Sequence, residues 1–358
     1  MTRAEAFFQS LPIPIVQAPM VGASTPAMTL AVSRAGGLGT LAAGAMAPAE
    51  IAAEIEALKA ATDRPFAVNL LMTEPARPDP QAVEAAIARL APWYEERGLP
   101  VPAAPNDFAP DFEAQLAAVA QAAPAAAGFT FSILTKDQVA ALHARDILVV
   151  GTATTVAEAR AWAEVGADVI CAQGAEAGGH RGHFLAPTEE SLVGTMALVP
   201  LMLQAVDLPV LAAGGIMDGR GVAAALALGA AAAQMGTAFL LSDQTGVSPP
   251  WRRAIETAGD DATRLTRAFS GRHARGLENE FMRRMRPIEA EIPAYPVQNR
   301  LTQPLRAAAG GMGDPEVISL WAGQAVKLAE PGEAGALVRR WWDEAKVAAA
   351  GLAERTRR

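Results

Sequence analysis

The side chains best suited to acid–base chemistry gather in one short stretch, residues 173–183. It supplies a side-chain amide, the carboxylate of Glu176, the imidazole of His180 and the guanidinium of Arg181. Glycines stand at positions 174, 178, 179 and 182, where backbone without side chains can approach a ligand closely. The stretch follows an apolar run, 168–172, that is predicted to be a buried strand. These features predict an active-site loop; the alternative is a glycine-rich connector whose polar groups face water.

Strands and helices that can position this loop alternate along the chain. Apolar runs bounded by glycine and proline predict eight strands, at residues 13–18, 38–42, 65–71, 126–131, 147–151, 168–172, 209–213 and 231–235. Helical periodicity fills the intervals, which implies parallel strands with right-handed crossovers. The predicted fold class is therefore α/β, a closed (β/α)8 TIM barrel. An open doubly wound sheet is less favoured, because the first strand is not followed by Gly-x-Gly-x-x-Gly.

Polar residues and glycines recur where the predicted strands end. Met20, Asn69 and Gln173 lie at the ends of the first, third and sixth strands. Glycine-containing pairs, 214–215 and 236–237, follow the seventh and eighth, where barrels commonly bind phosphate through backbone N–H groups. A phosphate together with a flat ring bordered by side-chain amides describes flavin mononucleotide (FMN). For each pair taken alone, a tight strand-to-helix turn is the alternative.

Other segments interrupt the alternation. A proline-rich insertion, 73–110, is predicted to hold one helix at about 81–97, and residues 242–312 are predicted to form a helical insertion that folds as a lid over the barrel mouth. The seven arginines between 264 and 286 are read as a solvated helix face rather than as an attraction for anions. Residues 314–328 are expected to form the eighth barrel helix, before a terminal helix with Trp341 and Trp342 on its inner face. The predicted domains are thus an FMN-binding barrel (1–241 with 313–330), the lid (242–312) and a C-terminal helix packed on the barrel (331–358).

Composition limits the classes of function. The net charge of −8 argues against nucleic-acid binding, and no apolar run predicts a membrane span. One cysteine, Cys171, excludes an internal disulfide and fits a reducing compartment. The first eleven residues lack a secretory apolar region. We therefore expect a cytoplasmic protein, monomeric or homodimeric, that acts on a small molecule. No metal site is predicted, since His180 and His183 lack ligand companions at useful spacing.

Taken together, these motifs resemble the nitronate monooxygenase family, formerly called 2-nitropropane dioxygenases. The resemblance runs in order from about residue 13 to residue 241, and a Tyr-Pro-x-Gln-Asn-x-Leu-Thr segment beginning at Tyr295 extends it. It rests on segments 17–20, 35–39, 69–70, 173–182, 212–216 and 234–237, of which Glu-Ala-Gly-Gly-His-Arg-Gly is the most specific. The family implies an FMN-containing barrel that oxidises alkyl nitronates, or nitroalkanes, with O₂ to a carbonyl compound and nitrite.

The resemblance also implies roles for single residues. His180 matches the catalytic histidine: an imidazolium can hold the nitronate anion, and a neutral imidazole can remove the α-proton of a nitroalkane. Tyr295 is the candidate substrate contact, with packing of the lid as the alternative. Glu176 and Arg181 are read as loop-ordering residues, and the role of His183 stays open. With the strand-end argument, the predicted cofactor contacts are Met20, Asn69, Gln173, Gly178, Gly214, Gly215, Gln234, Met235, Gly236 and Thr237.

The sequence departs from the family at two positions, and two other functions remain alternatives. Asn299 and Gln303 stand where some relatives carry Tyr or Lys around the substrate, so substrate identity is not carried over. FMN-dependent NAD(P)H reductases of enoyl thioesters or quinones use a similar Gly-Gly-His loop and are the first alternative. A non-redox phosphate-binding barrel is the second.

Overall fold

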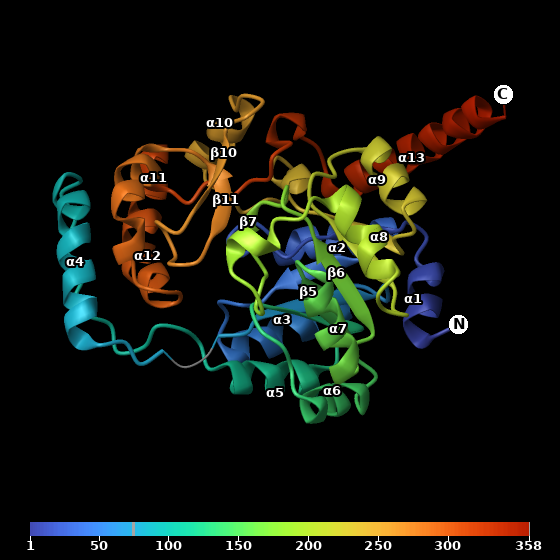
Figure 1. Ribbon diagram of the computed structural model, residues 1–358, viewed down its shortest axis with the longest axis horizontal. Helices are drawn as coiled ribbons and strands as arrows, with labels where there is room; N and C mark the ends of the chain where they lie inside the picture. The colour runs from blue at the N-terminus through green and yellow to red at the C-terminus, as the bar shows by residue number, and fades with distance from the viewer. Residues whose placement is uncertain (74–75, 358) are drawn as a thin grey trace.

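The computed structural model describes residues 1–73 and 76–357. Residues 74–75, in the predicted insertion, and residue 358, in the predicted terminal helix, lie outside the described residues. Figure 1 shows a central barrel, a side lobe made of α4, α11 and α12, and the helix α13 projecting from the opposite side. The bounds of α4 are Pro80–Glu95, those of α11 Glu280–Met285, those of α12 Val297–Met312 and those of α13 Ala334–Thr356.

Eight parallel strands form one sheet in the order β1-β9-β8-β6-β5-β4-β3-β2. Backbone hydrogen bonds close the ring: the Gln17 amide donates to the Leu38 carbonyl and the Leu38 amide to the Ile15 carbonyl, both at 2.9 Å. The (β/α)8 barrel and all eight expected strands are confirmed. The strands are β1 (Ile15–Gln17), β2 (Gly39–Ala42), β3 (Phe66–Leu71), β4 (Ala126–Thr130), β5 (Leu148–Ala153), β6 (Val169–Gln173), β8 (Val210–Ala213) and β9 (Ala232–Met235).

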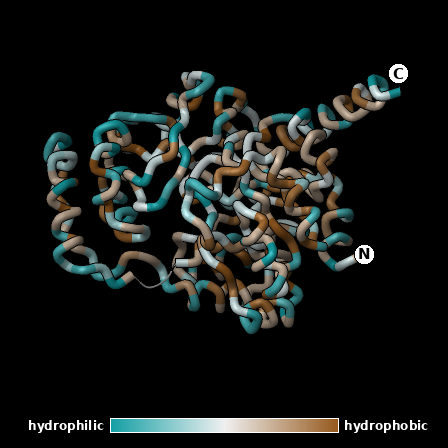
Figure 2. Tube along the Cα trace, viewed as in Figure 1, coloured by the Kyte–Doolittle hydropathy of each residue, from teal (hydrophilic) through white to brown (hydrophobic). Residues whose placement is uncertain are grey.

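Helices surround the barrel and begin where their sequences supply caps. The Thr25 side chain accepts from the Met28 amide, and Thr135 and Thr155 form capping boxes. Figure 2 shows hydrophobic stretches running through the middle of the molecule, where the strands lie. The helices are α1 (Arg3–Ser10), α2 (Pro26–Ala35), α3 (Pro48–Ala61), α5 (Phe112–Ala122), α6 (Lys136–His143), α7 (Val156–Val165), α8 (Thr195–Leu203) and α9 (Gly219–Ala227).

The lid is only partly helical, so the expectation of a helical insertion over 242–312 is wrong for its central part. It contains α10 (Pro249–Glu256), then an antiparallel pair, β10 (Thr263–Thr266) and β11 (Ala274–Leu277), before α11 and α12. The pair was missed because its four-residue strands are rich in arginine and lack an apolar run. Strand β11 also pairs with β7 (Gly179–His180), two residues inside the predicted active-site loop. The lid therefore shares a sheet with that loop.

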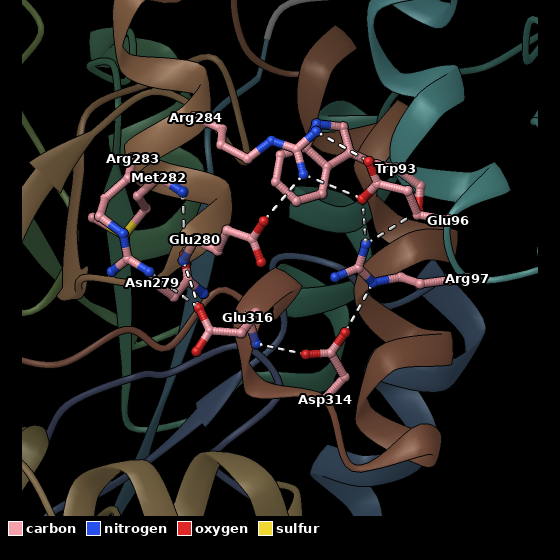
Figure 3. Close-up of polar contacts among 10 residues, drawn as sticks. All are labelled: Trp93, Glu96, Arg97, Asn279, Glu280, Met282, Arg283, Arg284, Asp314 and Glu316. Atoms are coloured by element: carbon pink, nitrogen blue, oxygen red, sulfur yellow. Dashed lines mark hydrogen bonds and ion pairs between the residues drawn. The ribbon is translucent and has the colours of Figure 1, made fainter.

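Within the predicted insertion, residues 76–110 pack on the lid. The predicted helix is present as α4, and it packs on α12. The buried hydroxyl of Tyr94 donates to the Leu301 carbonyl at 2.7 Å. At the end of α4, the Arg284 guanidinium lies 4.0 Å from the centroid of the Trp93 ring (Figure 3). Figure 3 also shows the ion pairs beside it, Arg284 with Glu96 at 3.1 Å and Arg97 with Asp314 at 2.8 Å. Helix α4 thus braces the lid.

The eighth barrel helix expected over 314–328 is not present. That segment holds only two 3-10 turns, Pro315–Val317 and Val326–Leu328, because Gly323 weakens a helix and the apolar side chains of the segment pack against the lid. Helix α13 instead packs between α9 and α2 and serves as the last barrel helix. Its Trp341 is buried and Trp342 is half-buried. The helix expected to begin at Thr188 begins at Thr195, after a 3-10 turn.

No helix within the described ranges is both long and apolar enough to cross a membrane. The single cysteine, Cys171, lies among the buried residues inside the barrel, where burial raises the pKa of its thiol to about 12.

Candidate functional site

His180 stands over the carboxyl ends of the barrel strands because two elements hold its short strand. On one side β7 pairs with β11, His180 lying opposite Ala274. On the other, the amide of Gln173 at the end of β6 bridges the loop: its Nε2 donates to the His180 carbonyl at 3.0 Å, and its Oε1 accepts from the Gly182 amide at 2.8 Å. Gln173, predicted as a cofactor contact, is therefore also the residue that fixes the histidine turn.

Glu176 and Arg181 order the same loop, as expected from the sequence. The fully buried guanidinium of Arg181 donates to the carbonyls of Gly174 at 2.7 Å and Ser191 at 2.9 Å. The Glu176 carboxylate accepts from both the backbone amide and the hydroxyl of Thr195, at the start of α8. Charge-assisted bonds of this kind hold a glycine-rich loop in one conformation.

Aromatic rings enclose the His180 imidazole. The ring centroids of Phe131, Tyr295 and Trp321 lie 5.6, 5.8 and 5.4 Å from that of His180. Phe131 follows β4 directly and has a φ of +89°, a left-handed conformation that a bulky side chain rarely adopts. Tyr295, the candidate substrate contact, is thus brought beside His180. Phe131 and Trp321 were not predicted from sequence, although the unusual backbone of Phe131 is a recurrent mark of functional sites.

The hydrogen bonds of Ser270 assign the tautomer of His180. We assign the Ser270 hydroxyl proton to the Arg272 carbonyl, 3.0 Å away, so that the hydroxyl oxygen accepts from His180 Nε2, which lies 2.8 Å away. The Nε2 atom therefore carries the proton in the neutral imidazole, and Nδ1 carries the lone pair. Ser270 was not predicted, since it lies ninety residues along the chain and is brought to the site by the lid.

Two guanidinium groups from the lid set the electrostatics around His180. Burial, and then the charges of Arg272 and Arg306, lower the pKa of His180 to about 3. The imidazole is consequently neutral at physiological pH. Burial also lowers the pKa of each guanidinium to about 10, so both remain cationic at neutral pH. The arrangement is a neutral base in a positively charged surrounding.

Not all of the arginines between 264 and 286 form the solvated face predicted from sequence. Arg283, Arg284 and Arg286 pair on the surface with Glu316, Glu96 and Glu278. Arg275, by contrast, is buried, and Arg272 packs 4.3 Å from the centroid of the Phe131 ring.

The strand ends beyond His180 present free backbone amides at two neighbouring loops. Gly214 and Gly215, after β8, adopt φ angles of +118° and +73°, which favour glycine. Across the described ranges, no backbone or side-chain acceptor pairs with the amides of Gly215, Gly236 or Thr237. A cavity of about 400 Å³ opens beside the first pair, with Gln324 at its edge. Unpaired amides around an open, glycine-lined space fit a phosphate group.

A third segment, missed from sequence, completes this cradle. The Gly323 amide donates to the Thr237 hydroxyl at 2.9 Å, and the Gln324 amide to the Glu176 carbonyl at 3.0 Å. A Cβ on Gly178 would lie 2.5 Å from the Gly323 nitrogen, so only glycine allows this approach. The signal available in the sequence was Ala-Gly-Gln at 322–324, a glycine between small and polar residues.

The remaining predicted cofactor contacts lie at the same level of the barrel. Met20 borders Gly236, whose added Cβ would stand 3.4 Å from the Met20 sulfur. Asn69 is buried beside Gly128 of β4, and the Gln234 side chain is half-buried. Met235 is 1% exposed and packs into the core, so only its backbone faces the strand ends.

His183, whose role the sequence left open, belongs to a separate chain of hydrogen bonds. Arg272 Nη2 donates to its Nδ1 at 3.2 Å, and its Nε2 lies 2.9 Å from the hydroxyl of Thr188. That hydroxyl also lies 2.8 Å from His273 Nδ1. His183 thus helps to orient Arg272.

A family model of nitronate monooxygenase matches residues 5–343. The chain belongs to the nitronate monooxygenase family. A probable nitronate monooxygenase of Staphylococcus saprophyticus is 41% identical over 327 residues, which cover 91% of this chain and 92% of that protein. A probable nitronate monooxygenase of Staphylococcus aureus is 40% identical over 321 residues, 89% of this chain and 90% of that one.

Solved structures agree with the family assignment. The crystal structure of a nitroalkane oxidase from Streptomyces ansochromogenes superposes with a TM-score of 0.89 at 40% identity, covering 97% of this chain and 99% of that one. FabK from Thermotoga maritima is less similar, with a TM-score of 0.76 and 29% identity over 99% of both chains. The resemblance seen in the sequence is confirmed, and this family member is an oxidoreductase of the nitronate monooxygenase kind.

Proposed function

We propose that this protein binds FMN and oxidises alkyl nitronates, or nitroalkanes, with O₂ to a carbonyl compound and nitrite. The observation that carries the proposal is a neutral His180 whose Nδ1 lone pair is free, beside glycine-lined loops that fit a phosphate. Membership of the family and the similarity to a nitroalkane oxidase support it.

Different residues at the strand ends would hold the phosphate and the ring of the cofactor. The free amides of Gly215, Gly236 and Thr237 would hold the phosphate, and the amide side chains of Asn69 and Gln234 would meet the polar edge of the ring. When bound, the flavin would supply the electron acceptor for the substrate.

His180 acts as the base for a neutral nitroalkane. Its Nδ1 removes the α-proton, while the Nε2–H stays bonded to Ser270 and keeps the ring in place. A nitronate has already lost that proton, so the histidine then orients the substrate. The enclosing rings of Phe131, Tyr295 and Trp321 exclude water around the organic group of the substrate.

The test begins with the absorbance spectrum of the purified protein and continues with mixing under anaerobic conditions. We expect a yellow protein whose flavin absorbance changes with a nitronate and not with NADH or NADPH, and which releases nitrite in air. Rapid bleaching by NADPH would favour the reductase alternative. A colourless protein that does not take up FMN would favour the phosphate-binding barrel.

The variant His180→Asn tests the base. It should keep its flavin and lose turnover of a neutral nitroalkane by about 10²- to 10⁴-fold, as for removal of a general base. His143→Asn, a change of the same type on α6, is the matched control and should keep full activity. Unchanged nitroalkane turnover in His180→Asn would falsify the assignment.

A further inference from the structure

The anionic group of the substrate needs a cationic partner, and His180 does not supply one. Its imidazole is neutral in the folded protein, held between Ser270 and three aromatic rings. The permanent charges beside it come from Arg272 and Arg306, and both reach the site from the lid.

Arg272 is tied to the protein through two of its three guanidinium nitrogens. Its Nε donates to the Arg181 carbonyl at 2.9 Å, and its Nη2 donates to the carbonyl and Nδ1 of His183. The plane of the group also packs on the Phe131 ring. These contacts tie the loop 178–183 to the lid, so Arg272 is a structural clamp.

Arg306 differs because its unpartnered donor, Nε, is buried. Its Nη2 donates to the carbonyl and Oδ1 of Asn299, both at 2.8 Å, and its Nη1 to the Ser319 hydroxyl at 3.3 Å. Its Nε is buried and has no partner among the described residues; the Nε of Arg181 shares this property, but the carboxylates of Glu158 and Glu176 offset the charge of Arg181. Buried N–H groups are nearly always paired, so a fixed guanidinium with a free N–H points to a ligand.

The surroundings of Arg306 lack a carboxylate that could neutralise it. In the described part of the chain, the groups that stabilise its charge are the phenols of Tyr295 and Tyr94, while burial acts against it. Tyr295 in turn contacts His180. A buried cation without a counterion favours an anionic ligand, since an oxyanion would supply both the missing charge and the missing acceptor.

We propose that Arg306 is the anion-binding residue of the site: its Nε–H receives an oxygen of the nitronate, next to Tyr295 and His180. This inference rests on the proposed function for the identity of the anion. The guanidinium recognises a small planar oxyanion, and Asn299, one of the two residues that depart from the family, serves to hold Arg306.

The test measures anion binding apart from turnover. Nitrate, a planar oxyanion that is not oxidised, is titrated into the purified full-length protein by calorimetry. We expect Arg306→Gln to weaken nitrate binding by about 10- to 100-fold, the effect of losing one charge-assisted hydrogen bond. The matched control is Arg300→Gln, an exposed arginine on the same helix whose Nη1 bonds Gln303, and its affinity should equal that of the wild type.

Steady-state kinetics supply the second measurement. In Arg306→Gln the KM for a nitronate should rise about 10- to 100-fold, whereas the KM for the neutral parent nitroalkane should change by less than about threefold. Arg306→Lys, which keeps the charge, should recover part of the nitronate affinity. Equal nitrate affinity in wild type and Arg306→Gln overturns the inference, and so does a wild type that binds no nitrate.

A second variant, Ser319→Ala, tests the same site if Arg306→Gln is not stable. If Arg306→Gln does not fold, as judged by circular dichroism, Ser319→Ala removes one bond that fixes the guanidinium and should weaken nitrate binding by about 2- to 10-fold. No weakening there counts against the inference. A wild type that binds nitrate through Arg306 but oxidises no nitronate would refute the proposed function and leave the anion site standing.

Discussion

The Nε2 atom of His180 lies 2.8 Å from the hydroxyl oxygen of Ser270, and this contact joins the active-site loop to the lid. Because the Ser270 hydroxyl donates elsewhere, the contact leaves Nδ1 as the one basic atom of the ring. Ser270 is thus a positioning residue for the proposed base.

Replacing Ser270 tests this role. In Ser270→Ala the imidazole of His180 loses the hydrogen bond that fixes its tautomer. We expect kcat for a nitroalkane to fall about 3- to 10-fold, with flavin content unchanged. Ser270→Thr, which keeps the hydroxyl, should restore kcat. Ser10→Ala removes a surface hydroxyl that donates to the Phe7 carbonyl and is the control. A kcat in Ser270→Ala equal to that of the wild type would contradict the assignment.

The protonation state of His180 can be followed directly. Burial and the charges of Arg272 and Arg306 lower its pKa to about 3, so the ring should stay neutral through the range in which an ordinary histidine titrates. In an NMR titration from pH 8 to pH 5, the His180 ring signals should not shift, with His180→Gln used to assign them. A titration midpoint of the His180 signals near pH 6.5 would show that the imidazole is not shielded from water.

Acid should destabilise the protein. Burial lowers the pKa of His183 to about 4, and burial is also the main cause that lowers the pKa of His273. The unfolded chain titrates near pH 6.5, so below that pH it binds more protons than the native state. Stability is therefore complete above pH 6.5 and declines as the pH falls towards 4. The urea midpoint should follow this trend, and His183→Gln should show a weaker decline; an equal decline would remove His183 from the explanation.

Flavin retention tests the cradle at the strand ends. A Cβ on Gly236 would lie 3.3 Å from Ala18 and 3.4 Å from the Met20 sulfur, and valine would fill the space before the Gly236 amide. We expect Gly236→Val to be purified largely without flavin, as read from its visible absorbance and its affinity for added FMN. Gly351→Val is the matched control, because nothing lies within 4 Å of the added Cβ. A fully yellow Gly236→Val would place the phosphate elsewhere.

The brace between α4 and α12 should contribute measurably to stability. In Tyr94→Phe the buried Leu301 carbonyl loses its donor, and we expect the free energy of unfolding to fall by about 1–2 kcal/mol. The exposed pair between Arg283 and Glu316 offers a comparison, since Arg283→Gln should change stability by less than about 1 kcal/mol. Equal effects on the urea midpoint would mean that the buried hydrogen bond has no special role.

The barrel was predictable because each strand is an apolar run bounded by glycine or proline, a local signal. The glycine-rich loop with His180 was predictable for the same reason, since its residues are contiguous. The strand β7 was not, because two residues carry no periodicity and its partner β11 lies almost a hundred residues away. Sequence also left open whether His180 binds the anion or acts as a base, since that depends on the burial of its ring.

The residues missed at the site share one property: their positions depend on long-range packing. Ser270, Arg272 and Arg306 enter from the lid, whose arginine-rich sequence looked like a solvated face. Only the fold separates the arginines that pair on the surface from those that turn inward. Phe131 was missed because a strand-end phenylalanine reads as core, and its positive φ is visible only in the structure.

The pairing of β7 with β11 couples the lid mechanically to the proposed base. His180 is a residue of the lid's own sheet, hydrogen-bonded to it along the backbone and through Ser270. A displacement of β11 would therefore move the backbone of His180 and the hydroxyl that positions its ring. Rigidity of the lid and precise placement of the base are for this reason one and the same requirement.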